Sequence, residues 1–131
     1  PGGWSYQLVK RGLQVTAIDN GAMDQKLMDS GLVEHVEADG FVWRPKRNVH
    51  WLVCDMIEKP SRVADLVGQW LADGAAERAM FNLKRFEEVK FCEHLIQDAV
   101  KDAGKKLERL QFRQLYHDRE EVTGYAVIKP S

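Results

Sequence analysis

Short apolar runs alternating with amphipathic stretches are the feature of this sequence that most restricts its fold. Runs of strand length occupy residues 13–18, 32–36, 49–54, 78–83, 107–116 and 122–128. Stretches with helical periodicity separate most of them, and the clearest spans residues 60–73, with Val63, Val67 and Trp70 on one face. Because strands joined through helices form a mainly parallel sheet, we predict an α/β fold.

The last two apolar runs have only the polar segment 117–121 between them. We therefore expect an antiparallel hairpin, with residues 122–128 as a reversed strand at the edge of a doubly wound sheet. Further helices are expected over residues 4–11, 22–30 and 85–103. The chain has 131 residues and no evident linker, so we expect a single domain.

Composition restricts the class of protein. Hydrophobic residues make up 44% and charged residues 30% of the chain, as in soluble globular proteins. No run reaches the roughly 20 apolar residues of a membrane span, and no signal peptide is evident. Cys54 and Cys92 have no CxxC spacing, which favours free thiols in the cytoplasm. With a net charge of −1, RNA binding would need local basic patches or a separate domain.

Ionisable residues stand where the predicted strands end. Sheets of this class bind ligands at the carboxyl ends of their parallel strands. Asp19, Asp39, Asp55 and Lys84 each follow a predicted strand, and Glu121 precedes the reversed one, which begins at the same sheet edge. One such residue alone is more simply a helix cap or a loop charge. Five together predict a site.

The chain opens with Pro1-Gly2-Gly3-Trp4, ahead of a predicted helix. Glycines let the backbone approach a ligand closely, although a plain turn explains them as well. They do not form GxGxxG, so a nicotinamide dinucleotide has little support. A carboxylate placed like that of Asp19 accepts hydrogen bonds from ribose hydroxyls, which suits any adenosine-containing ligand.

Four segments resemble the FtsJ-like ribose 2′-O-methyltransferases: PGGWS at residues 1–5, CDMIEKPSRVA at 54–64, FNLK at 81–84 and YHDREEVT at 116–123. The resemblance covers nearly the whole chain. It implies a Rossmann-like S-adenosylmethionine-dependent methyltransferase sheet, mostly parallel with a reversed C-terminal β-hairpin. Within the family, the chain is most similar to a bacterial enzyme that methylates a cytidine of large-subunit ribosomal RNA. A monomeric, cytoplasmic protein without metal is expected.

The resemblance also implies which residues hold S-adenosyl-L-methionine. Gly2, Gly3 and Trp4 match the residues that lie beside the methionine and ribose parts of the cofactor. Asp19 matches the residue that holds the ribose hydroxyls, and Asp39 the one that binds the adenine amino group.

The family's catalytic set is Lys-Asp-Lys-Glu. Asp55 matches the Asp of this set, and the residue in that position also faces the methyl group of the cofactor. Lys84 matches the second Lys of the set. Glu121 matches the Glu, and Glu120 is the neighbouring alternative. The family's first Lys and first strand have no counterpart here. The expectation is therefore a catalytic domain over residues 1–131, without the first strand and an RNA-binding region upstream.

One departure from the family and several polar residues stay open. The family has a few more residues between the positions of Lys84 and Arg85. Either a flexible loop of the protein is left out of this sequence, or the protein has a true deletion there. Lys59 and Arg62 have two interpretations: they contact RNA phosphates, or they contribute only to the electrostatics at the start of the helix that begins at residue 60. The basic turn 44–47 fits a phosphate contact or a solvated loop.

The remaining candidates have simpler interpretations. His117 and Asp118 fit hairpin packing as well as acid–base chemistry, and Trp43 fits an edge aromatic or base stacking. Cys92 and His94 point to different faces of their predicted helix, which argues against a metal site.

Two other functions compete with this interpretation. A small-molecule methyltransferase would leave the set of Asp55, Lys84 and Glu121 without an obvious purpose. A non-catalytic domain that binds S-adenosylmethionine or RNA is the alternative from a different class.

Overall fold

The computed structural model describes residues 15–19, 33–37, 41–54, 58–83, 88–114 and 122–130, the first two ranges by their backbone alone. The chain divides into two compact units, residues 1–44 and 45–131. The helices expected over residues 4–11 and 22–30 lie outside the described ranges.

The first unit contains a pair of parallel strands, β1 (Val15–Asp19) and β2 (Val33–Glu37). Their register runs from Val15 opposite Val33 to Asp19 opposite Glu37. Both strands fall in apolar runs where strands were expected. Because the strands are parallel and in register, their carboxyl ends lie at the same edge of this sheet.

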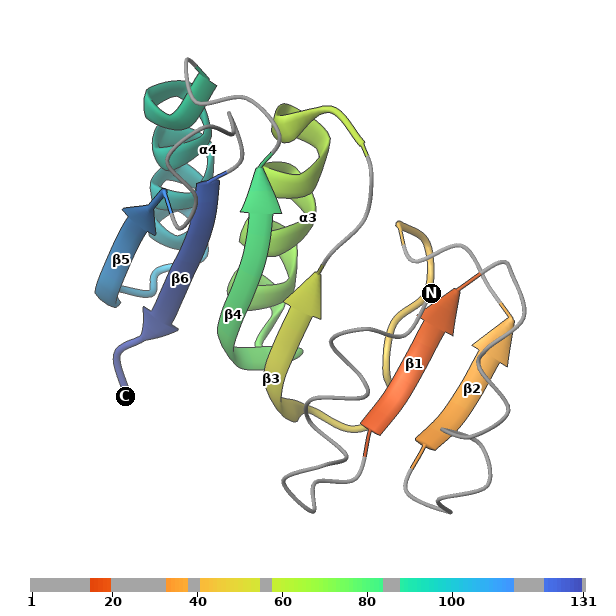
Figure 1. The fold of residues 1–131 in the computed structure, drawn as a ribbon. Coiled ribbons are helices and arrows are strands. Elements are labelled where there is room, and N and C mark those ends of the chain that lie inside the picture. Colours follow the sequence, from red (N-terminus) through yellow and green to blue (C-terminus); the bar gives the residue numbers. More distant parts are fainter. Residues whose placement is uncertain are drawn as a thin grey trace. The chain divides into compact units, whose positions relative to one another are not determined.

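The second unit is built on a four-stranded sheet: β3 (Val49–Cys54), β4 (Ala76–Leu83), β5 (Leu107–Arg113) and β6 (Val122–Ile128). The strand order is β3-β4-β6-β5 (Figure 1). β3 and β4 are parallel, whereas β6 is antiparallel to both of its neighbours. Three strands thus point the same way and β6 is reversed, which confirms the predicted C-terminal hairpin.

The predicted position of the reversed strand is wrong. β6 lies between β4 and β5, and β5 is the strand at the sheet edge. The side chains explain this order: Val122, Ala126 and Val127 of β6 are buried, as a strand with two neighbours requires. β5 instead alternates half-buried apolar residues with exposed polar ones, a pattern that is tolerated at an edge.

Two helices cover one face of this sheet, α3 (Pro60–Asp73) and α4 (Val89–Asp102) (Figure 1). The start and end of α3 are those predicted, since Pro60 occupies its first turn and Gly74 caps its end with a left-handed φ of 77°. The two helices pack closely at Gly68, where an added Cβ would lie only 3.0 Å from the Cβ of Ala99. A doubly wound sheet has helices on its second face as well, and the described residues place none there.

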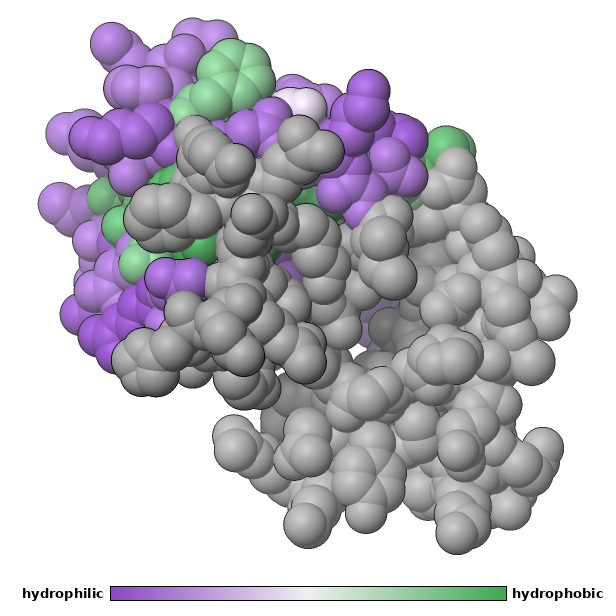
Figure 2. Space-filling model, turned by 45° about the horizontal axis from the view of Figure 1, so that its top comes forward, coloured by the Kyte–Doolittle hydropathy of each residue, from purple (hydrophilic) through white to green (hydrophobic). Residues whose placement is uncertain are grey.

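The core of the second unit lies between the helices and the sheet. The apolar face predicted for α3 is buried, and Phe81, Leu83 and Ile96 are among the largest fully buried side chains. Hydrophilic residues prevail on the described part of the surface in Figure 2. The apolar run at residues 49–54 predicts a buried strand, and this prediction is wrong. β3 lies at an edge of the four-stranded sheet, its first three residues are exposed, and Trp51 keeps 44% of its surface.

Other element ends differ by a few residues from those expected. β4 begins at Ala76, two residues earlier than its apolar run, and β5 ends at Arg113. α4 begins at Val89, after residues 84–87, which lie outside the described ranges.

Candidate active site

Three strand ends meet at one edge of the four-stranded sheet. β3 ends at Cys54, which is paired with Phe81 near the end of β4. β4 ends at Leu83, which is paired with Val122, the first residue of β6. The carboxyl ends of two parallel strands and the beginning of the reversed strand therefore lie side by side, which is where ligands of such sheets bind.

The predicted catalytic residues are the next residues of the chain at these three strand ends. Asp55 follows Cys54, Lys84 follows Leu83, and Glu121 precedes Val122. The three residues themselves, and the alternative Glu120, lie outside the described ranges. Their strands share one edge as the sequence required, and the meeting of their side chains stays a prediction.

Of the residues predicted to bind the cofactor, only Asp19 has a described backbone. It is the last residue of β1 and is in register with Glu37 at the end of β2. Its position at the carboxyl end of a parallel strand is the one expected. Gly2, Gly3, Trp4 and Asp39 lie outside the described ranges.

A buried polar pair joins β4 to β6 just inside the carboxyl edge. Thr123 Oγ1 donates a hydrogen bond of 2.8 Å to Asn82 Oδ1, and Asn82 is only 6% exposed. A buried polar side chain is costly unless it is hydrogen-bonded, so this pair favours a single register of the two strands. Sequence reasoning missed both residues, although Asn82 belongs to the FNLK segment and Thr123 to YHDREEVT.

An aromatic contact lies on the helix-covered face of the same strands. Phe81 and Phe112 meet edge to face with their ring centroids 5.9 Å apart, and both are in register with Gly124 of β6. A Cβ on Gly124 would overlap the Phe81 ring. Gly124 therefore makes room for the phenylalanine that packs beneath the end of β4.

The start of α3 decides one of the open alternatives. Arg62 Nη1 lies 3.0 Å from Glu58 Oε1, an ion pair between residues four apart. This contact favours the helix-start interpretation for Arg62 over a phosphate contact. Lys59 is the N-cap residue of α3 and is exposed, so its alternative stays open.

The cysteines show no sign of metal binding or nucleophilic chemistry. Neither Cys54 nor Cys92 forms a disulfide, and both are buried. Burial, together with the nearby Glu88 carboxylate, raises the pKa of the Cys92 thiol to about 11, so it stays protonated at neutral pH. No cluster of His, Cys, Asp and Glu that could hold a metal occurs within the described ranges.

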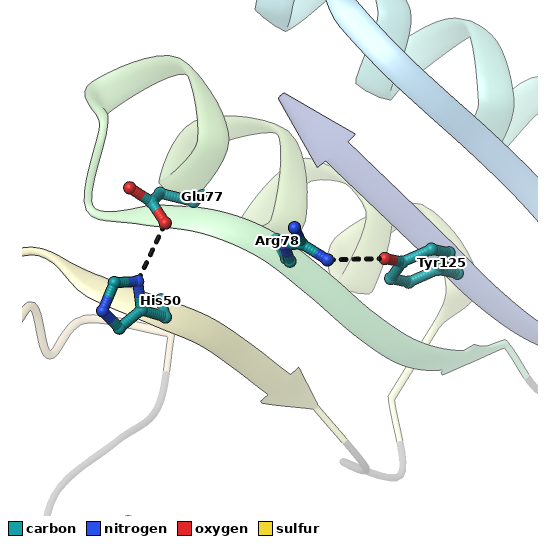
Figure 3. Close-up of polar contacts among 4 residues, drawn as sticks. All are labelled: His50, Glu77, Arg78 and Tyr125. Atoms are coloured by element: carbon teal, nitrogen blue, oxygen red, sulfur yellow. Dashed lines mark hydrogen bonds and ion pairs between the residues drawn. The ribbon is translucent and has the colours of Figure 1, made fainter. Parts of the chain in front are cut away.

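The face of the sheet opposite α3 and α4 carries aromatic and cationic side chains. Trp51 and Tyr125 stack with their ring centroids 5.6 Å apart. The Arg78 guanidinium lies 5.7 Å from the ring centroid of Trp51. Figure 3 shows Arg78 Nη1 donating a hydrogen bond of 3.3 Å to the Tyr125 hydroxyl. Trp51 is thus an exposed aromatic on an edge strand, whereas Trp70 belongs to the core, as the spacing of the α3 face predicts.

Curated proteins with related sequences place this chain in context. It is 57% identical over 130 residues to the ribosomal RNA large subunit methyltransferase M of Methylococcus capsulatus, covering 95% of the chain. The proteins of the same name from Aromatoleum aromaticum and Shewanella oneidensis are 52% and 50% identical over 98% and 100% of the chain. The chain is a homologue of these methyltransferases over nearly its whole length.

These methyltransferases M are much longer than the chain, which spans 37%, 36% and 38% of the three relatives. The match confirms the resemblance of the sequence to a bacterial methyltransferase of large-subunit ribosomal RNA. No protein-family model matches the chain.

Solved structures identify the fold of this chain. The N-methyltransferase NodS of Bradyrhizobium japonicum superposes with a TM-score of 0.59 at 11% identity, covering 99% of this chain and 81% of NodS. Fibrillarin of Aeropyrum pernix, solved with S-adenosyl-L-methionine, has a TM-score of 0.51 at 14% identity, covering 87% of this chain and 55% of its own. The fold is therefore the predicted Rossmann-like methyltransferase fold. Neither described helix has the length and apolar character of a membrane-spanning helix.

Proposed function

We propose that this chain is the catalytic part of an enzyme that uses S-adenosyl-L-methionine to methylate a ribose 2′-oxygen, that of a cytidine, in large-subunit ribosomal RNA. The observation that carries the proposal is the identity of half or more of its residues to the methyltransferase M proteins. Because the chain spans little more than a third of them, activity, substrate and partners are all proposed. A monomeric protein in the cytoplasm, where ribosomes are made in bacteria, fits this role.

The residues present fit the cofactor. Asp19 is the last residue of β1, at the carboxyl end of a parallel strand pair. A carboxylate in that position accepts hydrogen bonds from the two ribose hydroxyls of an adenosine group. Gly2, Gly3, Trp4 and Asp39 are proposed to hold the remaining parts of the cofactor. When bound, S-adenosyl-L-methionine supplies a methyl group activated by its sulfonium.

The protein's own task is to orient the ribose and to remove a proton. A ribose hydroxyl is a poor nucleophile at neutral pH, so Lys84 is proposed to contact the 2′-hydroxyl and to accept its proton as the oxygen is methylated. A lysine with its ordinary pKa of about 10.4 is a poor base, and desolvation lowers that pKa. Asp55 is proposed to position Lys84 and to face the methyl group. Glu121 is proposed to orient either the family's first catalytic Lys or the ribose.

The two carboxylates also limit this role of Lys84. Negative charge near an ammonium group favours its protonated form, so Asp55 and Glu121 oppose the loss of its proton. Orientation of the 2′-hydroxyl is therefore the larger part of the proposed contribution of Lys84. The strand ends that precede or follow these residues share one sheet edge, which supports the proposal.

The test is methyl transfer to RNA. The intact protein is incubated with S-adenosyl-L-methionine carrying a labelled methyl group and with large-subunit ribosomal RNA that lacks the modification. Label is expected in one cytidine, and a 2′-O-methyl group makes the adjoining phosphodiester resistant to alkali. Fully modified RNA serves as the control. Cofactor binding without transfer to unmodified RNA would instead support the non-catalytic alternative.

A further inference from the structure

A polar pair joins β4 to β6 close to two of the proposed catalytic residues. Asn82 and Thr123 are in register, and the Thr123 hydroxyl donates a hydrogen bond of 2.8 Å to Asn82 Oδ1. Asn82 comes two residues before Lys84 in the sequence. Thr123 comes two residues after Glu121. The hydrogen bond therefore links the two strands directly beside the residues on which the proposed reaction depends.

Side chains on both faces of the sheet restrain this end of the two strands. Leu83 and Val122, the last pair before the carboxyl edge, are fully buried in the core. Successive side chains of a strand point to opposite faces, so the polar pair lies on the other face from these two residues. Asn82 is buried there as well. Apolar packing thus holds the strand ends from one face, and a buried hydrogen bond holds them from the other.

The polar pair contributes more to geometry than to stability. Replacing both partners of a buried hydrogen bond by apolar side chains of the same shape can be nearly neutral, so stability alone does not require Asn and Thr at these positions. A hydrogen bond differs from an apolar contact because its length and angle each have a narrow optimum. It therefore fixes the spacing and register of the two strands more closely than packing does.

We propose that Asn82 and Thr123 are positioning residues for the proposed methyl transfer. Their hydrogen bond fixes the relative places of the strand ends that carry Lys84 and Glu121. A misplacement of about 1 Å in a catalytic group can lower the rate roughly 100-fold, which is why such groups need rigid support. In this role neither residue has to touch the substrate, because each acts through the catalytic residue two positions away. The inference rests on the proposed function, since it takes Lys84 and Glu121 as catalytic.

The test is a double-mutant cycle on the rate of methyl transfer. Asn82→Ala, Thr123→Val and the double variant of the intact protein are compared in single-turnover assays with saturating cofactor and unmodified large-subunit RNA. Each single variant should lower the rate about fivefold or more, while the dissociation constants for cofactor and RNA stay within about twofold of those of the unaltered protein. The double variant should lose little more than either single variant, because both changes remove the same hydrogen bond.

Two control variants separate positioning from general stability. Tyr125→Phe also removes a hydroxyl of β6 that is hydrogen-bonded to β4, where it accepts from Arg78, but this contact lies further from the carboxyl edge. Val127→Ala shortens a buried side chain near the other end of β6, so it lowers the melting temperature without touching the polar pair. Both controls should keep the rate within about twofold of that of the unaltered protein.

Three results would overturn the proposal: a normal rate in either single variant, losses that multiply in the double variant, or a loss in Val127→Ala as large as that in Thr123→Val. The last would make general destabilisation the cause. Should Asn82→Ala fail to fold, Thr123→Val and Thr123→Ser carry the test, since serine keeps the donor and should restore most of the rate. If the unaltered protein transfers no methyl group, the proposed function fails too, whereas normal transfer by both single variants overturns this inference alone.

Discussion

Thr123 donates a hydrogen bond to Asn82 across β4 and β6, one residue inside the point where both strands reach the proposed active site. The next residue after Asn82 in β4 is Leu83, which directly precedes Lys84. The pair therefore ties together the two strands that carry Lys84 and Glu121. Its loss should affect catalysis as well as stability.

Thr123→Val removes the hydroxyl while keeping the shape of the side chain. The buried Asn82 oxygen loses its donor, so the free energy of unfolding should fall by about 1–3 kcal/mol. The turnover number should fall severalfold, with cofactor affinity unchanged. Chemical denaturation and methyl-transfer kinetics measure both. Thr123→Ser keeps the hydroxyl and should retain most of the activity, and equal losses in the two variants would argue against the hydrogen bond as the cause.

Gly124→Ala should destabilise the sheet because its Cβ would overlap the ring of Phe81. Overpacking of this kind typically costs about 1–3 kcal/mol, which urea denaturation can measure. Phe81→Leu in the same chain removes the ring and should recover part of the loss. If the second change made no difference, the ring would not be what excludes the larger side chain.

The stability of the protein should depend on Cys92 in alkaline solution. The pKa of its thiol is raised from 9.0 to about 11 by burial and by the Glu88 carboxylate. The folded state therefore keeps a proton that the unfolded state loses between pH 9 and pH 11, and the free energy of unfolding falls as pH rises through this range. Below pH 9 the contribution is complete.

The measurement is urea denaturation at pH 8, 10 and 11, comparing the protein with Cys92→Ala. The variant is less stable at pH 8 because the smaller side chain leaves a cavity. Between pH 8 and pH 11, however, its free energy of unfolding should fall less than that of the unaltered protein, by on the order of 2 kcal/mol. Parallel losses in both proteins would show that other groups cause the alkaline dependence.

Local sequence signals predicted the helix α3 and the carboxyl ends of β3 and β4 well. Pro60 and Gly74 mark the boundaries of α3 through their own backbone preferences, and the spacing of Val63, Val67 and Trp70 identifies its buried face. Such features depend on residues close together in the sequence. The position of the proposed active-site edge followed from them once the strands were taken as parallel.

Long-range relationships could not be predicted in the same way. The place of β6 between β4 and β5 depends on pairings between strands about 40 residues apart, which no local periodicity encodes. The contact of Asn82 with Thr123 and the fit of Phe81 over Gly124 depend on the same pairing. The roles of Lys84, Asp55 and Glu121 came from family resemblance and still await direct tests.

Asp19→Ala should weaken the binding of S-adenosyl-L-methionine. The carboxylate at the end of β1 is proposed to accept hydrogen bonds from the ribose, and losing bonds to a charged group costs about 1.5–3 kcal/mol. The dissociation constant measured by calorimetry should rise roughly 10- to 100-fold. Asp73→Ala is a matched control, since this exposed residue ends α3. Equal affinity in the two variants would remove Asp19 from the cofactor site.

Lys84→Ala should abolish most methyl transfer without weakening cofactor binding. Loss of a positioned group that accepts a proton typically lowers the rate by about 10²–10⁴-fold, measured in single-turnover assays with saturating RNA. Lys84→Arg keeps the positive charge but cannot act as a base, so it separates the two parts of the role. If orientation dominates, arginine recovers part of the rate and the pH dependence flattens; if proton removal dominates, arginine is as inactive as alanine. Near-normal transfer by Lys84→Ala would contradict both parts.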